Sequence, residues 1–170
     1  LPKDLRALLY KAKHEDVEMG VLQAILPSNE RQMKRALSMV LRTGKKRVGV
    51  LGLSFKPDTD DLRESPLVLL VESLLGKGYD LKIYDHNVSL ARIMGANRQY
   101  IERVIPHITS LMCDDLEEVI ADSEVLVIGH RTPALSQRIG QLVNSRTVID
   151  LVRVSDAPQN LGEAYCGICW

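Results

Sequence analysis

Apolar residues in the first 43 positions recur at every third or fourth position, the spacing of amphipathic helices. One run spans residues 5–12, a second spans residues 17–25 and a third spans residues 33–41. Proline lacks the backbone N–H that a helix interior requires, so we expect Pro27 to separate the second helix from the third. Ser28 or Asn29 is then expected to cap the third helix.

The third run forms a regular apolar stripe, whose burial the sequence leaves open. The stripe consists of Met33, Ala36, Leu37, Val40 and Leu41. The helices either pack on their own domain or connect that domain to another domain or subunit. A small helical segment has little core of its own, which favours the connector. We therefore predict that residues 1–43 form a helical connector that also builds a homodimer or a higher homo-oligomer.

From residue 45 onward, short apolar runs typical of buried strands alternate with helical patterns. The strands are predicted at residues 47–53, 81–84, 124–129 and 147–151. The helices are predicted at residues 66–78, 88–111, 114–122 and 133–143. This alternation favours an α/β fold, in which right-handed crossovers place helices on both faces of a parallel sheet. Residues 44–170 are thus expected to form a Rossmann-like, doubly wound domain.

The segment between the first predicted strand and its helix carries the most informative chemistry. Residues 52–66 read Gly-Leu-Ser-Phe-Lys-Pro-Asp-Thr-Asp-Asp-Leu-Arg-Glu-Ser-Pro. Lys56, Arg63 and the amides of a helix that Ser65 caps, with Pro66 in its first position, can converge on a phosphate group. Alternatively, nearby carboxylates hold both cations in a local ion-pair network. These carboxylates are Asp58, Asp60, Asp61 and Glu64.

Two neighbouring features decide whether this segment resembles a dinucleotide site. Gly49 and Gly52 are spaced as GxxG, and Phe55 stands where the third glycine of a GxGxxG fingerprint is needed, so this is not that fingerprint. Asp85 ends the second predicted strand, where such folds place an acid that binds a ribose. Asp85 can equally begin a turn or cap the helix that follows.

Residues 52–66 also resemble one protein family closely, the nucleotide-sugar 6-dehydrogenases, which oxidise UDP-glucose, GDP-mannose and related compounds. The form Gly-Leu-Ser-Phe-Lys-Pro-x-Thr-x-Asp-x-Arg-Glu-Ser-Pro carries the resemblance. Residues 1–4, Leu-Pro-Lys-Asp, resemble the end of the family's catalytic motif, Gly-Gly-Ser-Cys-Leu-Pro-Lys-Asp. The resemblance covers essentially the whole chain and implies the central helices and the C-terminal domain of such an enzyme.

The resemblance implies roles for four side chains. Lys56 is implied to contact the nucleotide-sugar substrate, and Arg63 to reach NAD held by another domain. Lys3 is implied to contact substrate or cofactor and is assigned here to the cofactor, whereas Asp4 is implied to assist hydrolysis of a thioester. The nucleophilic cysteine of the motif would stand just before Leu1. The chain alone is therefore expected to be inactive and to need the N-terminal NAD-binding domain of the same enzyme.

Leu1 stands where the common UDP-glucose branch has phenylalanine, which favours the GDP-mannose branch of bacterial alginate synthesis. Residues 53–56 and 167–170 favour the same branch. The implied reaction converts GDP-mannose, two NAD+ and water to GDP-mannuronate. Two alternatives stay open. One is a dehydrogenase of UDP-glucose or UDP-N-acetylmannosamine, and the other is a nucleotide-binding or regulatory module without chemistry.

The composition narrows the classes of partner. The 22 basic and 22 acidic residues cancel, so no global field favours nucleic acid or an anionic membrane. No apolar run approaches the roughly 20 residues that span a bilayer. The start of the chain shows no signal segment. A cytoplasmic protein that binds neither nucleic acid nor membrane is therefore expected.

Histidines and cysteines give weak signals. The four histidines show no metal-ligand spacing, so no metal site is expected. His130 and Arg131 follow the third predicted strand, at the edge where such folds bind ligands, and no role is assigned to them. Cys166 and Cys169 form a CxxC near the end of the chain, where two ordinary thiols are the better interpretation.

Overall fold

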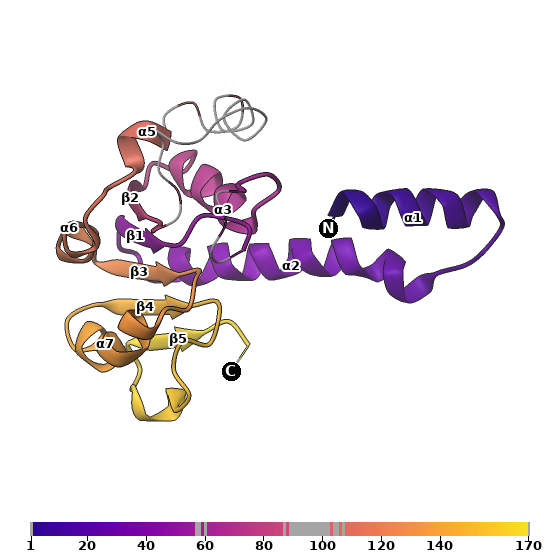
Figure 1. Ribbon diagram of the computed structural model, residues 1–170. Coiled ribbons are helices and arrows are strands. Elements are labelled where there is room, and N and C mark those ends of the chain that lie inside the picture. Colours follow the sequence, from indigo (N-terminus) through magenta and orange to yellow (C-terminus); the bar gives the residue numbers. More distant parts are fainter. Residues whose placement is uncertain are drawn as a thin grey trace. The chain divides into compact units, whose positions relative to one another are not determined.

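The computed structural model describes residues 2–56, 59, 61–86, 88, 103, 106 and 108–169 (Figure 1). The chain divides into two compact units, Leu1–Arg35 and Ala36–Trp170. The division lies inside helix α2 (Gly20–Arg42). The predicted boundary between residues 43 and 44 stays a prediction.

The first unit contains helix α1 (Pro2–His14) and the first part of α2. Pro27 lies inside α2, so the predicted break there is wrong and one helix replaces two. Proline removes one backbone hydrogen bond, but the bonds of the flanking turns carry the helix onward. Several large apolar side chains of this unit are exposed. They are Leu8, Tyr10, Val17, Val21 and Ile25.

The second unit is built on a five-stranded parallel sheet with the order β2-β1-β3-β4-β5. The strands are β1 (Arg47–Leu51), β2 (Asp80–Tyr84), β3 (Val125–Ile128), β4 (Thr147–Asp150) and β5 (Tyr165–Gly167). The predicted α/β fold with a parallel sheet is confirmed, and so are the first four strands within one or two residues. The fifth strand was missed, because three residues that include Cys166 and Gly167 show no strand pattern.

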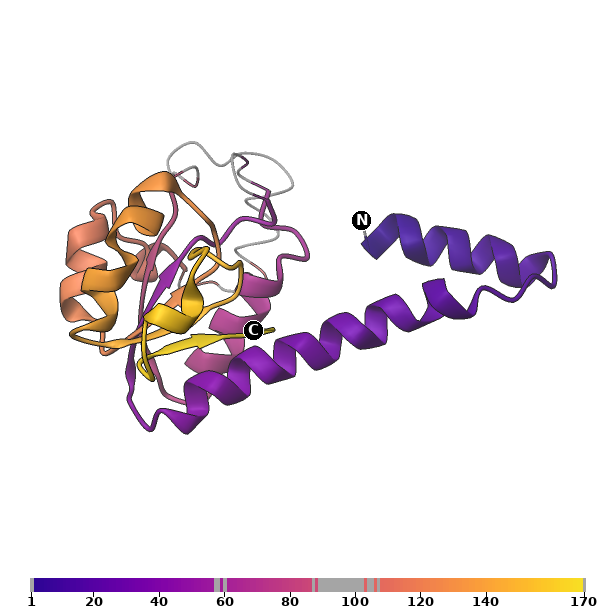
Figure 2. The same ribbon diagram turned by 90° about the horizontal axis from the view of Figure 1, so that it is seen from below.

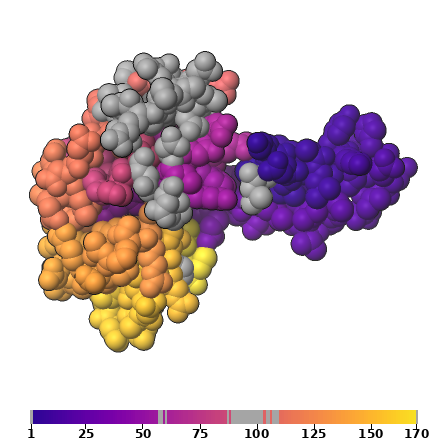
Figure 3. Space-filling view, in the orientation of Figure 1, coloured from indigo at the N-terminus to yellow at the C-terminus, as the bar shows by residue number. Residues whose placement is uncertain are grey.

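Helices cover both faces of the sheet, with α6 and α7 on one face and α3 on the other (Figure 2). Side chains of α6 and α7 form much of one side of the surface in Figure 3. The helices of this unit besides α2 are α3 (Pro66–Leu75), α5 (Ile108–Leu111), α6 (Leu116–Asp122) and α7 (Pro133–Val143), with a short 3-10 helix at Pro158–Asn160. Most of the helix predicted at residues 88–111 lies outside the described residues.

The hydrophobic core explains why these elements form. Apolar side chains of α6 and α7, among them Val119 and Ile139, share one buried cluster with strand residues such as Leu126 of β3. Within α2, Ala36 and Val40 of the predicted stripe are buried, whereas Leu41 keeps 37% of its surface exposed. In the part of the chain that the structure describes, no helix is long and apolar enough to cross a membrane.

The strand order places a topological switch point beside β1. The chain continues from β1 to β2 on one side, whereas β3 pairs with β1 on the other. The carboxyl ends of β1 and β3 therefore meet at one edge, where folds of this class bind their ligands. The amides of Gly129 and His130 both donate to the carbonyl of Leu51, at 2.8 and 3.2 Å, so the loops after the two strands are joined directly.

Candidate functional site

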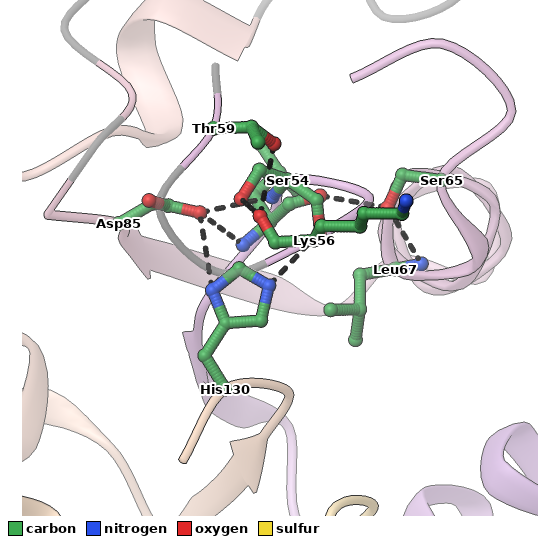
Figure 4. Close-up of polar contacts among 8 residues, drawn as sticks. Ser54, Lys56, Thr59, Ser65, Leu67, Asp85 and His130 are labelled. Carbon is green, nitrogen blue, oxygen red and sulfur yellow. Dashed lines mark hydrogen bonds and ion pairs between the residues drawn. The ribbon is translucent and has the colours of Figure 1, made fainter. Parts of the chain in front are cut away.

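Near the start of the loop after β1, Leu53 and Ser54 each have both their backbone amide and their backbone carbonyl engaged. We call the described residues of this loop, 52–56, 59 and 61–65, the β1 loop. Asp85 Oδ2 accepts hydrogen bonds from the amides of Leu53 and Ser54, at 2.6 and 2.9 Å. The Leu53 carbonyl accepts from Ser65 Oγ at 2.7 Å, and the Ser54 carbonyl lies 3.0 Å from His130 Nε2 (Figure 4). The start of the loop is therefore held by three side chains from different parts of the chain.

Asp85 acts on the protein backbone instead of presenting its carboxylate to a ligand. Its side chain is only 1% exposed, which disfavours the ribose contact considered for it. Its carbonyl accepts a hydrogen bond from the amide of Val88 at 3.3 Å, so the alternative that Asp85 begins a turn is confirmed. Two amides on one carboxylate oxygen make this aspartate an anchor for the β1 loop.

Gly52 is required because a histidine ring approaches its Cα. Its φ of +97° is in the region that favours glycine. A Cβ at this position would stand 2.6 Å from His130 Cγ. The group that comes close to the backbone at Gly52, the last glycine of the GxxG, is thus the His130 side chain and not a phosphate. Because Asp85 also takes the next two amides, this turn does not fit the diphosphate of a dinucleotide.

The middle of the β1 loop presents Lys56. The Lys56 carbonyl accepts hydrogen bonds from Ser54 Oγ and Thr59 Oγ1, both at 2.9 Å. A backbone bond of 2.7 Å from the Phe55 amide to the Asp61 carbonyl closes the loop across its width. The Lys56 side chain is exposed. A fixed backbone thus carries a cation that extends into solvent.

Arg63 is paired with Asp61, as the ion-pair alternative required. Arg63 Nε and Nη2 lie 2.8 Å from the two carboxylate oxygens of Asp61. Both side chains are partly exposed, at 51% and 39%. Asp58 and Asp60 of the predicted network lie outside the described residues. The bidentate pair fixes the plane of the guanidinium while leaving it at the surface.

The start of α3 follows the sequence prediction. Ser65 is its N-cap and is fully buried, and Pro66 occupies the first helical position. Ser65 Oγ accepts from the Leu67 amide at 3.3 Å. The Leu67 amide is therefore already used by the cap. The predicted anion would be bound mainly by the two cations of the loop, Lys56 and Arg63, and less by the helix N-terminus.

Lys3 and Asp4 lie in the first turn of α1, within the other compact unit, and both are exposed. An acidic residue in this position is favourable for the helix itself, because the N-terminal end of the helix dipole is positive. The roles that the resemblance implies for these two residues stay predictions.

The loops after β3 and β4 contain a second anchored segment. Asp150 is fully buried and accepts from the amides of Val152 and Val154, at 2.8 and 2.6 Å. Arg131 binds both carboxylate oxygens of Asp156, at 3.0 and 3.1 Å. Sequence reasoning missed the anchoring roles of Asp85 and Asp150. The sequence signal that could have indicated these roles is an aspartate at the carboxyl end of an apolar strand.

Among the residues that the structure describes, no cluster of three histidine, cysteine or acidic side chains could hold a metal ion. Cys113 and Cys166 are half-buried, and Cys169 is exposed.

The sequence of this chain matches a known protein family. The sequence profile of the UDP-glucose/GDP-mannose dehydrogenase family, UDP binding domain, matches residues 49–157. GDP-mannose 6-dehydrogenase of Pseudomonas aeruginosa is 46% identical over 170 residues, which cover 100% of this chain and 38% of that enzyme. A UDP-glucose 6-dehydrogenase of Haloferax volcanii is 41% identical over 87 residues, 49% of this chain and 20% of that enzyme.

A solved structure agrees with these matches. A ternary complex of GDP-mannose dehydrogenase from Pseudomonas aeruginosa superposes with a TM-score of 0.89 at 45% identity, over 100% of this chain and 38% of that chain. The chain therefore belongs to the UDP-glucose/GDP-mannose dehydrogenase family, and it corresponds to the C-terminal portion of these enzymes. It spans 38% of the length of the Pseudomonas aeruginosa relative. The resemblance drawn from residues 52–66 is confirmed.

Proposed function

We propose that this chain supplies the nucleotide-sugar-binding part of an NAD-dependent 6-dehydrogenase that acts on GDP-mannose. The observation that carries the proposal is the 46% identity to a GDP-mannose 6-dehydrogenase across all 170 residues. The proposed reaction is the four-electron oxidation of GDP-mannose to GDP-mannuronate. The cytoplasmic location and the link to alginate synthesis stay predictions.

Lys56 is the proposed substrate-binding side chain. Its backbone carbonyl is held by Ser54 and Thr59, so the position of its Cα is defined before a ligand arrives. Its exposed ammonium can donate to a phosphate or sugar oxygen. A charge-assisted hydrogen bond of this kind contributes about 1.5–3 kcal/mol.

Arg63 is proposed to contact NAD from the surface of the β1 loop. Its bidentate pair with Asp61 orients the guanidinium in advance, which reduces the entropy lost when it binds a second anion. NAD supplies the hydride acceptor when it is bound. Because the turn after β1 does not fit a dinucleotide, we assign the main NAD site to the N-terminal domain that the relatives' greater length allows.

Lys3 and Asp4 complete the proposed set. They lie one after the other in the first turn of α1, where Lys3 is proposed to contact the cofactor and Asp4 to assist hydrolysis of a thioester. Support comes from the match over the full chain, which includes these positions. The exposed apolar residues of the first unit support a homodimer as the working form.

A second candidate function is binding of a UDP-sugar. The matching family profile is described as a UDP binding domain, and the Haloferax volcanii UDP-glucose 6-dehydrogenase is 41% identical over 87 residues. Calorimetric titration of the chain with GDP-mannose and with UDP-glucose separates the two. We expect GDP-mannose to bind at least about tenfold more tightly, a difference of about 1.4 kcal/mol. The opposite order would favour the UDP-sugar, and no binding of either compound would reject both candidates.

Activity can be tested with a chimera. The part of the Pseudomonas aeruginosa enzyme that precedes the matched region is joined to this chain, and NADH formation from GDP-mannose is followed. We expect the chimera to be active and the chain alone to be inactive, because the 170 residues contain no Gly-Gly-Ser-Cys sequence to supply the nucleophile of the motif. NADH production by the chain alone contradicts this assignment of the nucleophile.

A further inference from the structure

We propose that His130 is a positioning residue for the β1 loop, which sets Ser54 and, through Ser54, the backbone of Lys56. This inference deepens the proposed function and rests on it, because it concerns how the chain prepares the same nucleotide-sugar site. Sequence reasoning assigned no role to His130. The structure assigns one through a continuous series of contacts from β3 to Lys56.

The series has two hydrogen bonds. His130 Nε2 lies 3.0 Å from the Ser54 carbonyl, and Ser54 Oγ donates to the Lys56 carbonyl at 2.9 Å. Ser54 is 1% exposed and His130 is 9% exposed, so water does not compete strongly for either group. The last member of the series, Lys56, is the exposed cation of the loop. A change at His130 therefore reaches Lys56 through one intervening residue.

The chemistry of the contact defines the tautomer of the ring. A carbonyl oxygen can only accept, so Nε2 must carry the proton that it donates to Ser54. Nδ1 then faces Asp85 Oδ2 at 3.8 Å, which is beyond hydrogen-bond distance. Asp85 already accepts from the amides of Leu53 and Ser54. His130 and Asp85 therefore hold Ser54 by its carbonyl and its amide respectively.

The packing of His130 against Gly52 gives the ring one available position. A Cβ at Gly52 would stand 2.6 Å from Cγ and 2.8 Å from Nδ1 of His130. The absence of a side chain at Gly52 thus leaves the space that the imidazole occupies. His130 follows β3 after one residue, Gly129, and its backbone amide donates to the Leu51 carbonyl at 3.2 Å. A rigid strand thereby sets where the β1 loop starts.

A matched set of variants separates hydrogen bonding from ring packing. His130→Phe keeps a ring against Gly52 but removes the donor to Ser54. His130→Gln can place an amide donor near the position of Nε2, whereas His130→Asn places one near Nδ1 and does not reach Ser54. The full chain is titrated with GDP-mannose by calorimetry, and Lys77→Ala serves as a control for a surface change far from the β1 loop.

We expect His130→Phe to weaken GDP-mannose binding about five- to tenfold, the effect of one lost neutral hydrogen bond. His130→Gln should restore affinity to within about twofold of wild type, and His130→Asn should behave like His130→Phe. If His130→Phe does not fold, the comparison of Gln with Asn decides alone. Equal affinity of the Gln and Asn variants, or wild-type affinity of His130→Phe, overturns the inference.

Amide hydrogen exchange tests the role of His130 without relying on the identity of the substrate. If the wild-type chain binds no nucleotide sugar, the proposed function fails, and the exchange of the Leu53 and Ser54 amides then decides the role of His130. We expect faster exchange at both amides in His130→Phe and His130→Asn, with protection recovered in His130→Gln. Unchanged protection in all three variants rejects His130 as a positioning residue.

Discussion

The Asp85 carboxylate accepts a 2.6 Å hydrogen bond from the amide of Leu53, 32 positions earlier in the chain. The two residues meet because β1 and β2 are paired in parallel, with Leu51 opposite Tyr84, so both strands end at one edge. A carboxylate that accepts two backbone amides is a strong, charge-assisted anchor. The β1 loop therefore starts from a fixed point, and its cations project from a defined backbone.

The Gly52 position tests how closely the loop and His130 are packed. Gly52→Ala should lower the free energy of unfolding by roughly 2–4 kcal/mol, because positive φ costs about 1–2 kcal/mol and the His130 ring must also move. Gly44→Ala is the matched control, since Gly44 has a φ of +68° and no atom within 4 Å of its added Cβ. Urea unfolding of both variants gives the comparison. An equal decrease in the free energy of unfolding in both variants would show that the His130 ring moves aside without an energetic penalty.

Lys56 and Arg63 are expected to serve different ligands. In the chimera, Lys56→Ala should weaken GDP-mannose binding about 10- to 100-fold, and Arg63→Ala should mainly raise the KM for NAD by a similar factor. Lys77→Ala removes an exposed positive charge from the turn after α3 and is the control for net charge. Steady-state kinetics with each substrate varied separately measures both constants. Equal shifts of the two constants in both variants would show that the loop cations are structural.

A homodimer is expected to form through the exposed apolar residues of the first unit. Val21 and Ile25 lie one helical turn apart and are 83% and 37% exposed. Fully burying an exposed side chain of this size contributes about 1.5–3 kcal/mol before entropy costs, and Ile25, which is already partly covered, contributes less. The pair Val21→Glu and Ile25→Glu should therefore yield a folded monomer in sedimentation experiments, whereas Gln23→Glu should remain a dimer.

The dimer prediction has a clear contrary result. A wild-type chain that is folded and monomeric at micromolar concentration rules the dimer out. Val40→Glu is the complementary variant, because Val40 is 0% exposed within the second unit. It should unfold the chain instead of dissociating it, since the charge would be buried without a partner.

Cys113 is expected to react more slowly than Cys169 with iodoacetamide near neutral pH. Burial raises the pKa of the Cys113 thiol, and the carboxylate of Glu118 raises it further. A raised pKa leaves less thiolate at a given pH, so the alkylation rate of Cys113 should increase only at higher pH. Glu118→Gln should accelerate this reaction, and Glu72→Gln, which removes an exposed acid on α3, should not. Mass spectrometry of the alkylated peptides resolves the individual sites.

Local patterns in the sequence were sufficient for the alternation of strands and helices, the Ser65 cap and the Pro66 start of α3. Each of these depends on neighbouring residues, through the 3.6-residue helix period, the buried-strand pattern or the geometry of a helix start. The motif in residues 52–66 was sufficient to indicate the family. Local patterns failed at Pro27, where the surrounding turns maintain α2, and at β5, which is too short to show a pattern.

Only the tertiary structure decided what holds the β1 loop. His130 stands 76 positions from Ser54, and Asp85 stands 31 positions from it. Neither distance in sequence suggests a contact, and an aspartate after a strand is equally compatible with a ribose site. The contacts arise because β1, β2 and β3 are neighbours in one parallel sheet, whose carboxyl ends bring three separate segments to the same edge. Sequence alone therefore indicates which cations the loop carries, and sheet order determines how their backbone is held.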